Sequence, residues 1–233
     1  MDFHIPEQYK NIAVKLSGGA DSTILLYMTI HWLQENNRND VMVHAMTLTE
    51  LRNNFSNSRM SMQTLNWILK KTKFTNFKMH HTLYTYEKNN EEYFLNLENE
   101  IIVNNKLDLV LSGNNANPLE KSILIEDGDG NIQDLAKMFL EERNADQPRY
   151  LNHPLDTSKS LRKCDFYQPF HRSDKKVIAE LYKKYDVMDL FRITKSCTTP
   201  GSTPTTLCGT CWQCLERKWA FGDEHNKLGW ISI

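Results

Sequence analysis

Long apolar runs are missing from this sequence. No stretch approaches the ~18 consecutive apolar residues that a membrane-spanning helix needs. The first six residues, Met1 to Pro6, also lack the basic start and the apolar centre of a secretory signal peptide. These two absences argue against membrane insertion and secretion, so we expect a cytoplasmic protein with no membrane partner.

An excess of charge of either sign is also missing. The 28 basic and 29 acidic residues leave a formal net charge of −1, and the sequence pI is about 6.7. Proteins that bind nucleic acid through its phosphates usually carry a surplus of Lys and Arg. The charge balance therefore argues against nucleic acid as a partner.

Cysteine is scarce, and its placement is uneven. The sequence has five cysteines, and four of them, Cys197, Cys208, Cys211 and Cys214, follow the spacing C-x10-C-x2-C-x2-C. In a chain without a signal peptide such clustering favours metal over disulfides. Four thiolates suit tetrahedral Zn²⁺ and leave no open position, so we expect a structural zinc ion. An iron–sulfur cluster is the alternative. Cys164 stands apart and is interpreted as an isolated thiol.

Two familiar phosphate-binding patterns, GxxxxGK[ST] and GxGxxG, are missing as well. The chain has instead the segment Leu16-Ser17-Gly18-Gly19-Ala20-Asp21-Ser22, between an apolar run and a stretch of helical periodicity. Adjacent glycines let several N–H groups turn toward one point, and the start of the following helix adds its positive end. Asp21 fits such an anion site if Mg²⁺ lies between it and the phosphates. The alternative is an ordinary strand-to-helix turn with a capping Ser or Asp.

Apolar runs of strand length alternate with segments of helical periodicity along the chain. Strands are expected at 11–16, 41–46, 78–83 and 107–112, and helices after the glycine turn to about 37, at 58–71, at 91–105 and from about 174. This alternation predicts an α/β fold with a doubly wound, mainly parallel sheet. Ligands of such sheets bind outside the carboxyl ends of the strands, so the glycine loop and Gly113 are expected to meet there.

Two polar segments carry further expectations. Residues 126–134 suggest a calcium loop, but Ile132 stands where glycine is needed and Met138 where a bidentate Glu belongs, so we expect a solvated acidic turn. Residues 144–168 are expected to form a long loop.

Lys175 and Lys176 fall in the first turn of a helix that Ser173 or Asp174 would cap, where positive charge is unfavourable. An anion nearby would offset that cost; two solvated lysines are the alternative.

The glycine segment Ser17 to Ser22 resembles the SGGxDS pyrophosphate loop of the N-type ATP pyrophosphatases. Three further stretches extend the resemblance to the 7-cyano-7-deazaguanine synthase family of these enzymes: Pro169-Phe170 with Lys175, Ser196-Cys197, and Cys208 to Arg217, a CGxCxxCxxR string. The resemblance implies an adenine nucleotide alpha hydrolase-like domain over residues 1–190 and a zinc-binding segment over 191–233. It also implies ATP, Mg²⁺ and Zn²⁺ as cofactors, and a homodimer.

The family's reaction follows from the same resemblance. Its members convert 7-carboxy-7-deazaguanine to the nitrile with ammonia, adenylating the substrate with ATP and releasing AMP and pyrophosphate. Carried over, the ATP-binding residues are Leu16, Ser17, Gly18, Gly19, Ala20, Asp21, Ser22 and Gly113. The catalytic residues are Ser17, Asp21, Ser22 and Lys175. Because the second strand ends at the same crevice of the sheet, main-chain groups near Met46 or Leu48 are expected to contact adenine.

One stretch departs from the family pattern. Gly113 is followed by Asn114-Asn115-Ala116-Asn117-Pro118, where the family has a Tyr-Pro-Asp-Cys-Arg-like stretch that shapes the deazapurine pocket. The identity of the acid is therefore less defined than its activation by ATP. Two other functions stay open at this point: a tRNA-thiolating or other sulfur-transfer enzyme, and a repurposed ATP-binding module with another acid or a macromolecular partner.

Overall fold

The computed structural model describes residues 3–50, 55–84, 91–118, 120–138, 162–197 and 206–227. Its main feature is a five-stranded sheet with the order β3-β2-β1-β4-β7, in which every neighbouring pair is parallel. The strands are β1 (Asn11–Lys15), β2 (Met42–Glu50), β3 (Phe77–Tyr84), β4 (Leu109–Leu111) and β7 (Asp165–Tyr167). The order reverses at β1, which confirms the predicted doubly wound α/β fold.

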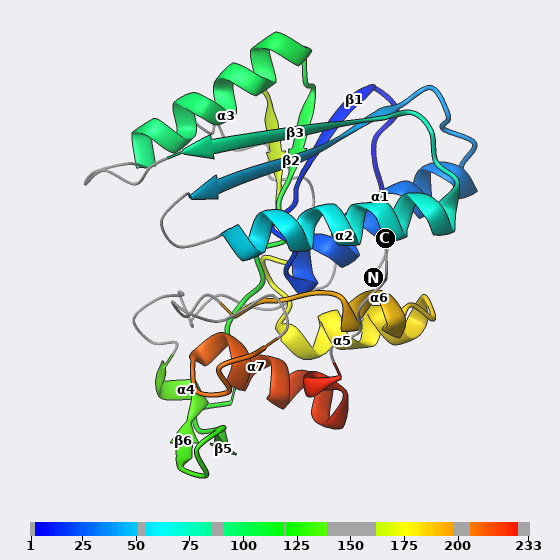
Figure 1. Ribbon diagram of the computed structural model, residues 1–233. Coiled ribbons are helices and arrows are strands. Elements are labelled where there is room, and N and C mark those ends of the chain that lie inside the picture. The colour runs from blue at the N-terminus through cyan, green and yellow to red at the C-terminus, as the bar shows by residue number, and fades with distance from the viewer. Residues whose placement is uncertain are drawn as a thin grey trace.

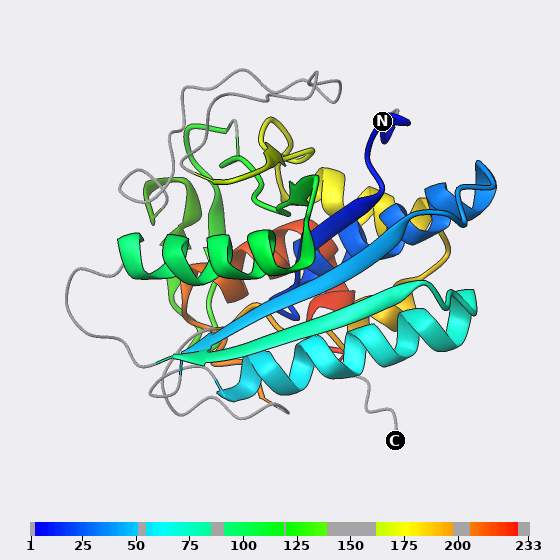
Figure 2. The ribbon, with the colours of Figure 1, turned by 90° about the horizontal axis from the view of Figure 1, so that it is seen from above.

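Helices cover both faces of this sheet (Figure 1). Two of them, α1 (Ala20–Glu35) and α2 (Phe55–Thr72), lie on one face, and α3 (Glu91–Asn105) crosses the other face, as Figure 2 shows from above. A third layer lies beyond α1, because α5 (Lys175–Lys184) packs on α1 and α7 (Trp212–Phe221) packs on α5. The short helix α6 (Met188–Arg192) and a 3₁₀ turn (Gly222–Asn226) complete this layer.

The main core surrounds α1 and includes buried residues of the sheet, α2, α5 and α6. Ile12 and Val14 of β1 point into it, whereas Ala13 faces the smaller core under α3. Helix α1 is buried continuously from Ser22 to Ile30, as expected of a helix that is apolar on all sides. Each fully buried Leu or Ile in it contributes about 1.5–3 kcal/mol, so the glycine loop sits on a rigid element.

The structure corrects two expectations. The long loop predicted at 144–168 is wrong at its end, where Asp165–Tyr167 form β7 beside β4; residues 139–161 lie outside the described residues. The acidic turn predicted at 126–134 is a hairpin of β5 (Leu124–Glu126) and β6 (Ile132–Asp134), followed by α4 (Leu135–Met138). Its Asp127 is buried and accepts hydrogen bonds from the N–H groups of Asp129 and Asn131, whereas residues 128–131 are exposed, as predicted for a solvated turn.

Across the described ranges, none of the helices combines the length and the apolar character needed to cross a bilayer.

Candidate nucleotide site and four-cysteine cluster

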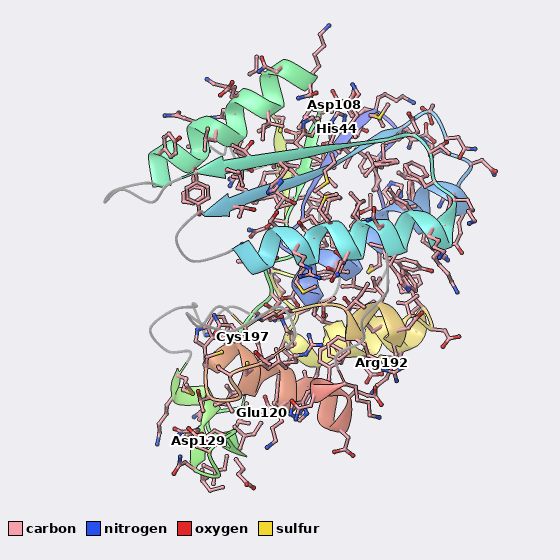
Figure 3. The ribbon with its side chains drawn as sticks, viewed as in Figure 1. His44, Asp108, Glu120, Asp129, Arg192 and Cys197 are labelled. Atoms are coloured by element: carbon pink, nitrogen blue, oxygen red, sulfur yellow. The ribbon has the colours of Figure 1, made fainter. Side chains whose placement is uncertain are left out.

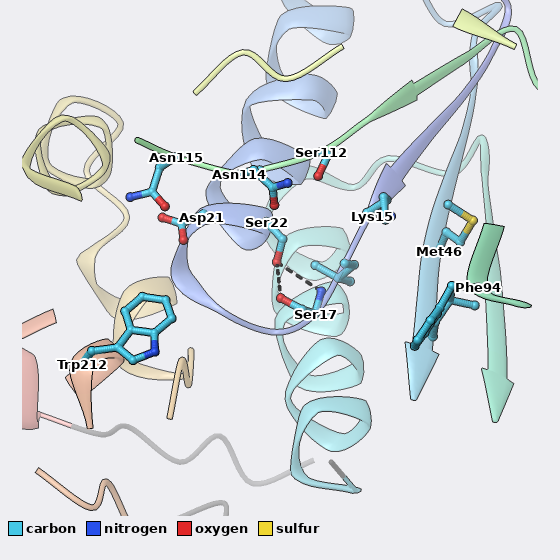
Figure 4. A pocket seen from close by; sticks show the side chains of 13 residues that line it. Lys15, Ser17, Asp21, Ser22, Met46, Phe94, Ser112, Asn114, Asn115 and Trp212 are labelled. Carbon is cyan, nitrogen blue, oxygen red and sulfur yellow. Dashed lines mark hydrogen bonds between the residues drawn. The ribbon is translucent and has the colours of Figure 1, made fainter. Parts of the chain in front are cut away.

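The glycine loop joins β1 to α1 at the carboxyl end of the sheet. Its two serines face each other across the turn: Ser17 Oγ and Ser22 Oγ share a hydrogen bond of 3.0 Å, and the Ser17 N–H donates to Ser22 Oγ over 3.1 Å (Figure 4). Ser22 Oγ also lies 3.3 Å from the carbonyl of Gly19, to which it donates. These bonds gather two hydroxyls at the N-terminus of α1, where an anion is favoured.

Two glycines are required by the close packing around this loop. Gly18 has φ +79°, and a Cβ there would lie 2.6 Å from Met60 Cβ and from the Ser61 nitrogen of α2. Gly113, which follows β4, lies against the first turn of α1, and a Cβ there would lie 2.8 Å from the Ser22 nitrogen. The structure therefore brings Gly113 against the glycine loop, as the sequence predicted.

A cavity of about 560 Å³ opens over the loop. Of the residues predicted to bind a nucleotide, its lining includes Leu16, Ser17, Asp21, Ser22 and Gly113. Met46 and Leu48, in the second half of β2, also line it, whereas Gly18, Gly19 and Ala20 do not. The predicted contact of loop, second strand and fourth strand is thus present at the switch point of the sheet.

Three side chains of the cavity were not predicted. Lys15 ends β1, Phe94 comes from α3, and Trp212 is the first residue of α7; Figure 4 shows Phe94 and Trp212 on opposite sides of the loop. Lys15 is held by the buried Glu98, whose Oε2 lies 3.2 Å from Lys15 Nζ. Lys15 could have been predicted as a site residue, because it is a charged residue at the end of an apolar strand. The sequence offers no such indication for Phe94, since its helical spacing predicts only that it is buried.

The predicted catalytic lysine lies behind Asp21 and is not part of the cavity lining. Lys175 Nζ lies 2.5 Å from Asp21 Oδ2 and 3.6 Å from Glu216 Oε2. Positive charge is unfavourable in the first turn of α5, and these two carboxylates are nearby anions that offset this cost. The cap of α5 is Asp174, which accepts the N–H of Lys176. Asp21 Oδ1 is buried and has no hydrogen-bond partner among the described residues, which fits an oxygen ligand for Mg²⁺.

The four clustered cysteines meet at one point, and Figure 3 shows Cys197 beside α7. Their sulfur atoms all lie within 4.8 Å of one another; the Cys208–Cys214 and Cys211–Cys197 separations are 3.8 and 3.9 Å. Hydrogen bonding to Cys197 raises the pKa of Cys211 to about 11, so the free cluster favours thiols, and a cation is needed to hold thiolates. This cluster can hold a metal ion, as predicted.

The fifth cysteine is not set up as a nucleophile. Cys164 lies just before β7 and donates its S–H to the carbonyl of Asp165 over 3.4 Å. Burial raises the pKa of this thiol to about 12. A reactive cysteine needs the opposite, a lowered pKa, so the interpretation of Cys164 as an isolated thiol agrees with its surroundings.

Comparison with known proteins leaves the family of this chain open. No protein-family model and no curated protein matches the sequence. Among solved structures, the chain is similar to the U34-tRNA thiolase NcsA from Methanococcus maripaludis with its [4Fe-4S] cluster, with 13% sequence identity and a TM-score of 0.47. The match covers 83% of this chain and 60% of that chain, so this chain spans less than two thirds of the length of NcsA. At this level of likeness, function has to be argued from the residues of the site.

Proposed function

We propose that this chain is an N-type ATP pyrophosphatase, which splits ATP between the α and β phosphates and transfers AMP to a carboxylate. One observation supports this most directly. The facing hydroxyls of Ser17 and Ser22, together with Asp21, lie at the start of α1 in a cavity of about 560 Å³. Cavities of ~300–1,000 Å³ are typical of small-ligand sites, so a nucleotide fits this space.

Each part of the cavity takes one part of ATP in this proposal. The loop N–H groups, with the hydroxyls of Ser17 and Ser22, bind pyrophosphate, and the segment of β2 from Met46 to Leu48 contacts adenine. Asp21 Oδ1 would hold Mg²⁺, which when bound neutralises phosphate charge. Lys175 keeps the other oxygen of Asp21 occupied and adds positive charge behind the loop.

The proposed reaction needs positioning and charge neutralisation more than covalent catalysis by the protein. A carboxylate oxygen of the substrate attacks the α-phosphorus, and the bond to the leaving pyrophosphate breaks. Ammonia then attacks the acyl carbon with its lone pair, AMP departs with the electrons of the C–O bond, and the nitrogen gives up its extra proton to solvent. The product is an amide. A second ATP adenylates the amide oxygen and releases pyrophosphate, and loss of AMP and of the two nitrogen-bound protons then leaves the nitrile.

We propose a 7-carboxy-7-deazaguanine-like acid as the substrate, supported by the sequence resemblance over the loop, Lys175 and the cysteine string. The same resemblance supports an ATP domain over 1–190, a metal-binding segment over 191–233, and a homodimer.

We propose that the four clustered cysteines bind zinc. A tetrahedral ion with Zn–S bonds of ≈ 2.3 Å has sulfur–sulfur edges of about 3.8 Å, close to the two separations of 3.8 and 3.9 Å. The cysteines of a [4Fe–4S] cluster bind different irons, which keeps their sulfurs farther apart.

The test is direct. Purified protein is incubated with ATP, Mg²⁺, ammonium and 7-carboxy-7-deazaguanine, and AMP, pyrophosphate and the amide or nitrile are measured, with Asp21→Asn as the control. Nitrile formation with AMP, lost in Asp21→Asn, is the expected result. AMP formation only with another acid would keep the ATP site and overturn the substrate. Inactivity with every acid, together with tRNA thiolation or with nucleotide binding alone, would favour one of the two other functions.

A further inference from the structure

We propose that Glu216 is a positioning residue of the nucleotide site: it holds Lys175 against Asp21 Oδ2, so that Asp21 Oδ1 is presented to a divalent cation. This inference rests on the proposed function, because the cation is the one that would accompany ATP. It adds a residue from the cysteine-bearing helix α7, far from the glycine loop in sequence.

The geometry places Glu216 behind the site and outside the cavity. Its side chain is 1% exposed, and its Oε2 lies 3.6 Å from Lys175 Nζ. Glu216 does not line the cavity, whereas Asp21 does. Any effect of Glu216 on a bound nucleotide therefore has to pass through a neighbour, and Lys175, itself only 3% exposed, lies between the two carboxylates.

The charges of the three side chains explain why two carboxylates share one lysine. Asp21 and Glu216 contribute −2 and Lys175 contributes +1, which leaves one negative charge for a divalent cation bound to phosphate. Without Glu216, Lys175 would neutralise Asp21, and the local charge would fall to zero. A cation bound to Asp21 would also weaken the attraction between Asp21 and the buried ammonium of Lys175. The carboxylate of Glu216 then remains as the negative partner that this ammonium needs.

Helix α7 is held on both sides of Glu216. Before it, Cys211 at the N-cap of α7 and Cys214 in its first turn belong to the cysteine cluster. The next residue, Arg217, is fully buried; it donates to the hydroxyl of Thr194 over 2.8 Å and to the carbonyl of Phe191 over 3.2 Å. These contacts fix the height and rotation of α7, and with them the position of the Glu216 carboxylate.

A second contact orients this carboxylate from the cavity side. Asn115, which lines the cavity, donates from Nδ2 to Glu216 Oε1 over 3.5 Å. One oxygen of Glu216 thus faces Asn115 and the other faces Lys175. The divergent stretch after Gly113 therefore contributes a side chain to this network, which gives Asn115 a role that does not depend on the acid substrate.

The experiment measures Mn²⁺ binding by electron paramagnetic resonance, in the presence of an α,β-methylene analogue of ATP that cannot be split. We expect Glu216→Gln to weaken Mn²⁺ binding about tenfold, while the affinity for the analogue at saturating metal changes less than about threefold. Glu216→Asp, which keeps the charge, should recover part of the loss. Glu180→Gln, at an exposed position on α5, is the matched control and should bind Mn²⁺ as the wild type does.

A double-mutant cycle separates positioning from a purely structural role. In a Lys175→Met background, Glu216→Gln should change Mn²⁺ affinity less than twofold, because Glu216 acts through Lys175. An equal loss in both backgrounds, or no loss in the wild-type background, would overturn the inference. If Glu216→Gln fails to fold, Glu216→Asp is compared in the same two backgrounds. If the wild type binds no analogue at all, the proposed function fails and the inference fails with it, a result distinct from any effect of the variants.

Discussion

Asp21 and Lys175 lie 154 positions apart along the chain, yet their side chains meet with 2.5 Å between Asp21 Oδ2 and Lys175 Nζ. The first belongs to the glycine loop at the start of α1, and the second to the first turn of α5. This contact joins the glycine loop to the outer helical layer. It also makes the charge of Lys175 important for stability.

Replacing Lys175 by Met should destabilise the fold. The change leaves the buried carboxylate of Glu216 without the cation that faces it, and breaking a buried ion pair in this way costs about 3–5 kcal/mol. Urea unfolding of Lys175→Met should show this loss as a lower midpoint with an unchanged slope. Lys176→Met is the control, because Lys176 is exposed and pairs with Glu120 at the surface, so its free energy of unfolding should change by less than about 0.5 kcal/mol. Equal midpoints for the two variants would contradict the burial argument.

Metal content should depend on the four clustered cysteines and not on Cys164. We expect elemental analysis to find one zinc per chain, lost in Cys214→Ser and kept in Cys164→Ser, because only the former removes a sulfur from the cluster. Removal of the ion by a chelator should lower the melting temperature, since metal binding stabilises the folded state. A visible charge-transfer absorption band with stoichiometric iron would instead identify an iron–sulfur cluster.

The two ends of the cavity should have separable effects. Phe94→Ala removes an aromatic ring near the end of β2 and is expected to weaken ATP binding about tenfold, while Trp212→Ala should change it less than threefold. The order should reverse for the KM of the acid, because Trp212 lies on the side of the loop away from Phe94 (Figure 4). Calorimetry with ATP and steady-state kinetics with the acid measure the two quantities. A single variant that weakens both equally would show that the two ends do not bind different ligands.

Stability should fall in mild acid because of one buried histidine. His44 of β2 stacks on His80 of β3, with 2.8 Å between His44 Nδ1 and His80 Nε2. Burial, the neighbouring His80 and then Lys78 lower the pKa of His44 to about 4. The unfolded chain binds the proton near its ordinary pKa of ~6.5, so the unfolded state holds more protons between pH 4 and 6.5. The contribution of neutral His44 to the stability of the folded state is therefore complete above about pH 6.5 and is lost as the pH falls toward 4.

The pH effect is measured as the free energy of unfolding at a series of pH values. The free energy of unfolding of the wild type should be lower at pH 4 than at pH 7, and His44 should account for on the order of 2–3 kcal/mol of that difference, because its pKa is lowered to about 4. We expect His44→Phe to lack this contribution. His4→Gln is the control, since His4 is exposed on the N-terminal segment. A wild-type profile parallel to that of His44→Phe would contradict the prediction.

Much of the fold could be predicted from local sequence patterns. The Gly18-Gly19 turn, the apolar run of β1 and the helical spacing in α3 are signals within a few residues, and each appears in the structure where it was expected. Strand β7 gave no such signal, because Asp165–Tyr167 is only 3 residues long and takes its strand conformation from pairing with β4. Tertiary pairing outweighs local preference in so short a segment.

The site was predictable only in part, for the same reason. The loop residues and the cysteines stand in recognisable strings, whereas the partners of Lys175 depend on how α5, α7 and α1 pack. The anion expected near Lys175 proved to include Glu216, which no local pattern connects with the glycine loop. The solvated turn predicted at 126–134 holds for the exposed residues 128–131 but not for Asp127, which is buried as a hydrogen-bond acceptor for its own turn.

The wide separation of the site residues also bears on synthesis of the protein. Ser17 and Asp21 leave the ribosome well before Lys175, which follows Asp21 by 154 positions, and before Trp212 and Glu216. Domains generally fold as units, and contacts between distant parts of a chain form slowly. A nascent chain that has β1 to β4 but not yet α7 lacks Trp212 and Glu216, so under the proposed function nucleotide and metal stabilise the protein only after α7 has been synthesised.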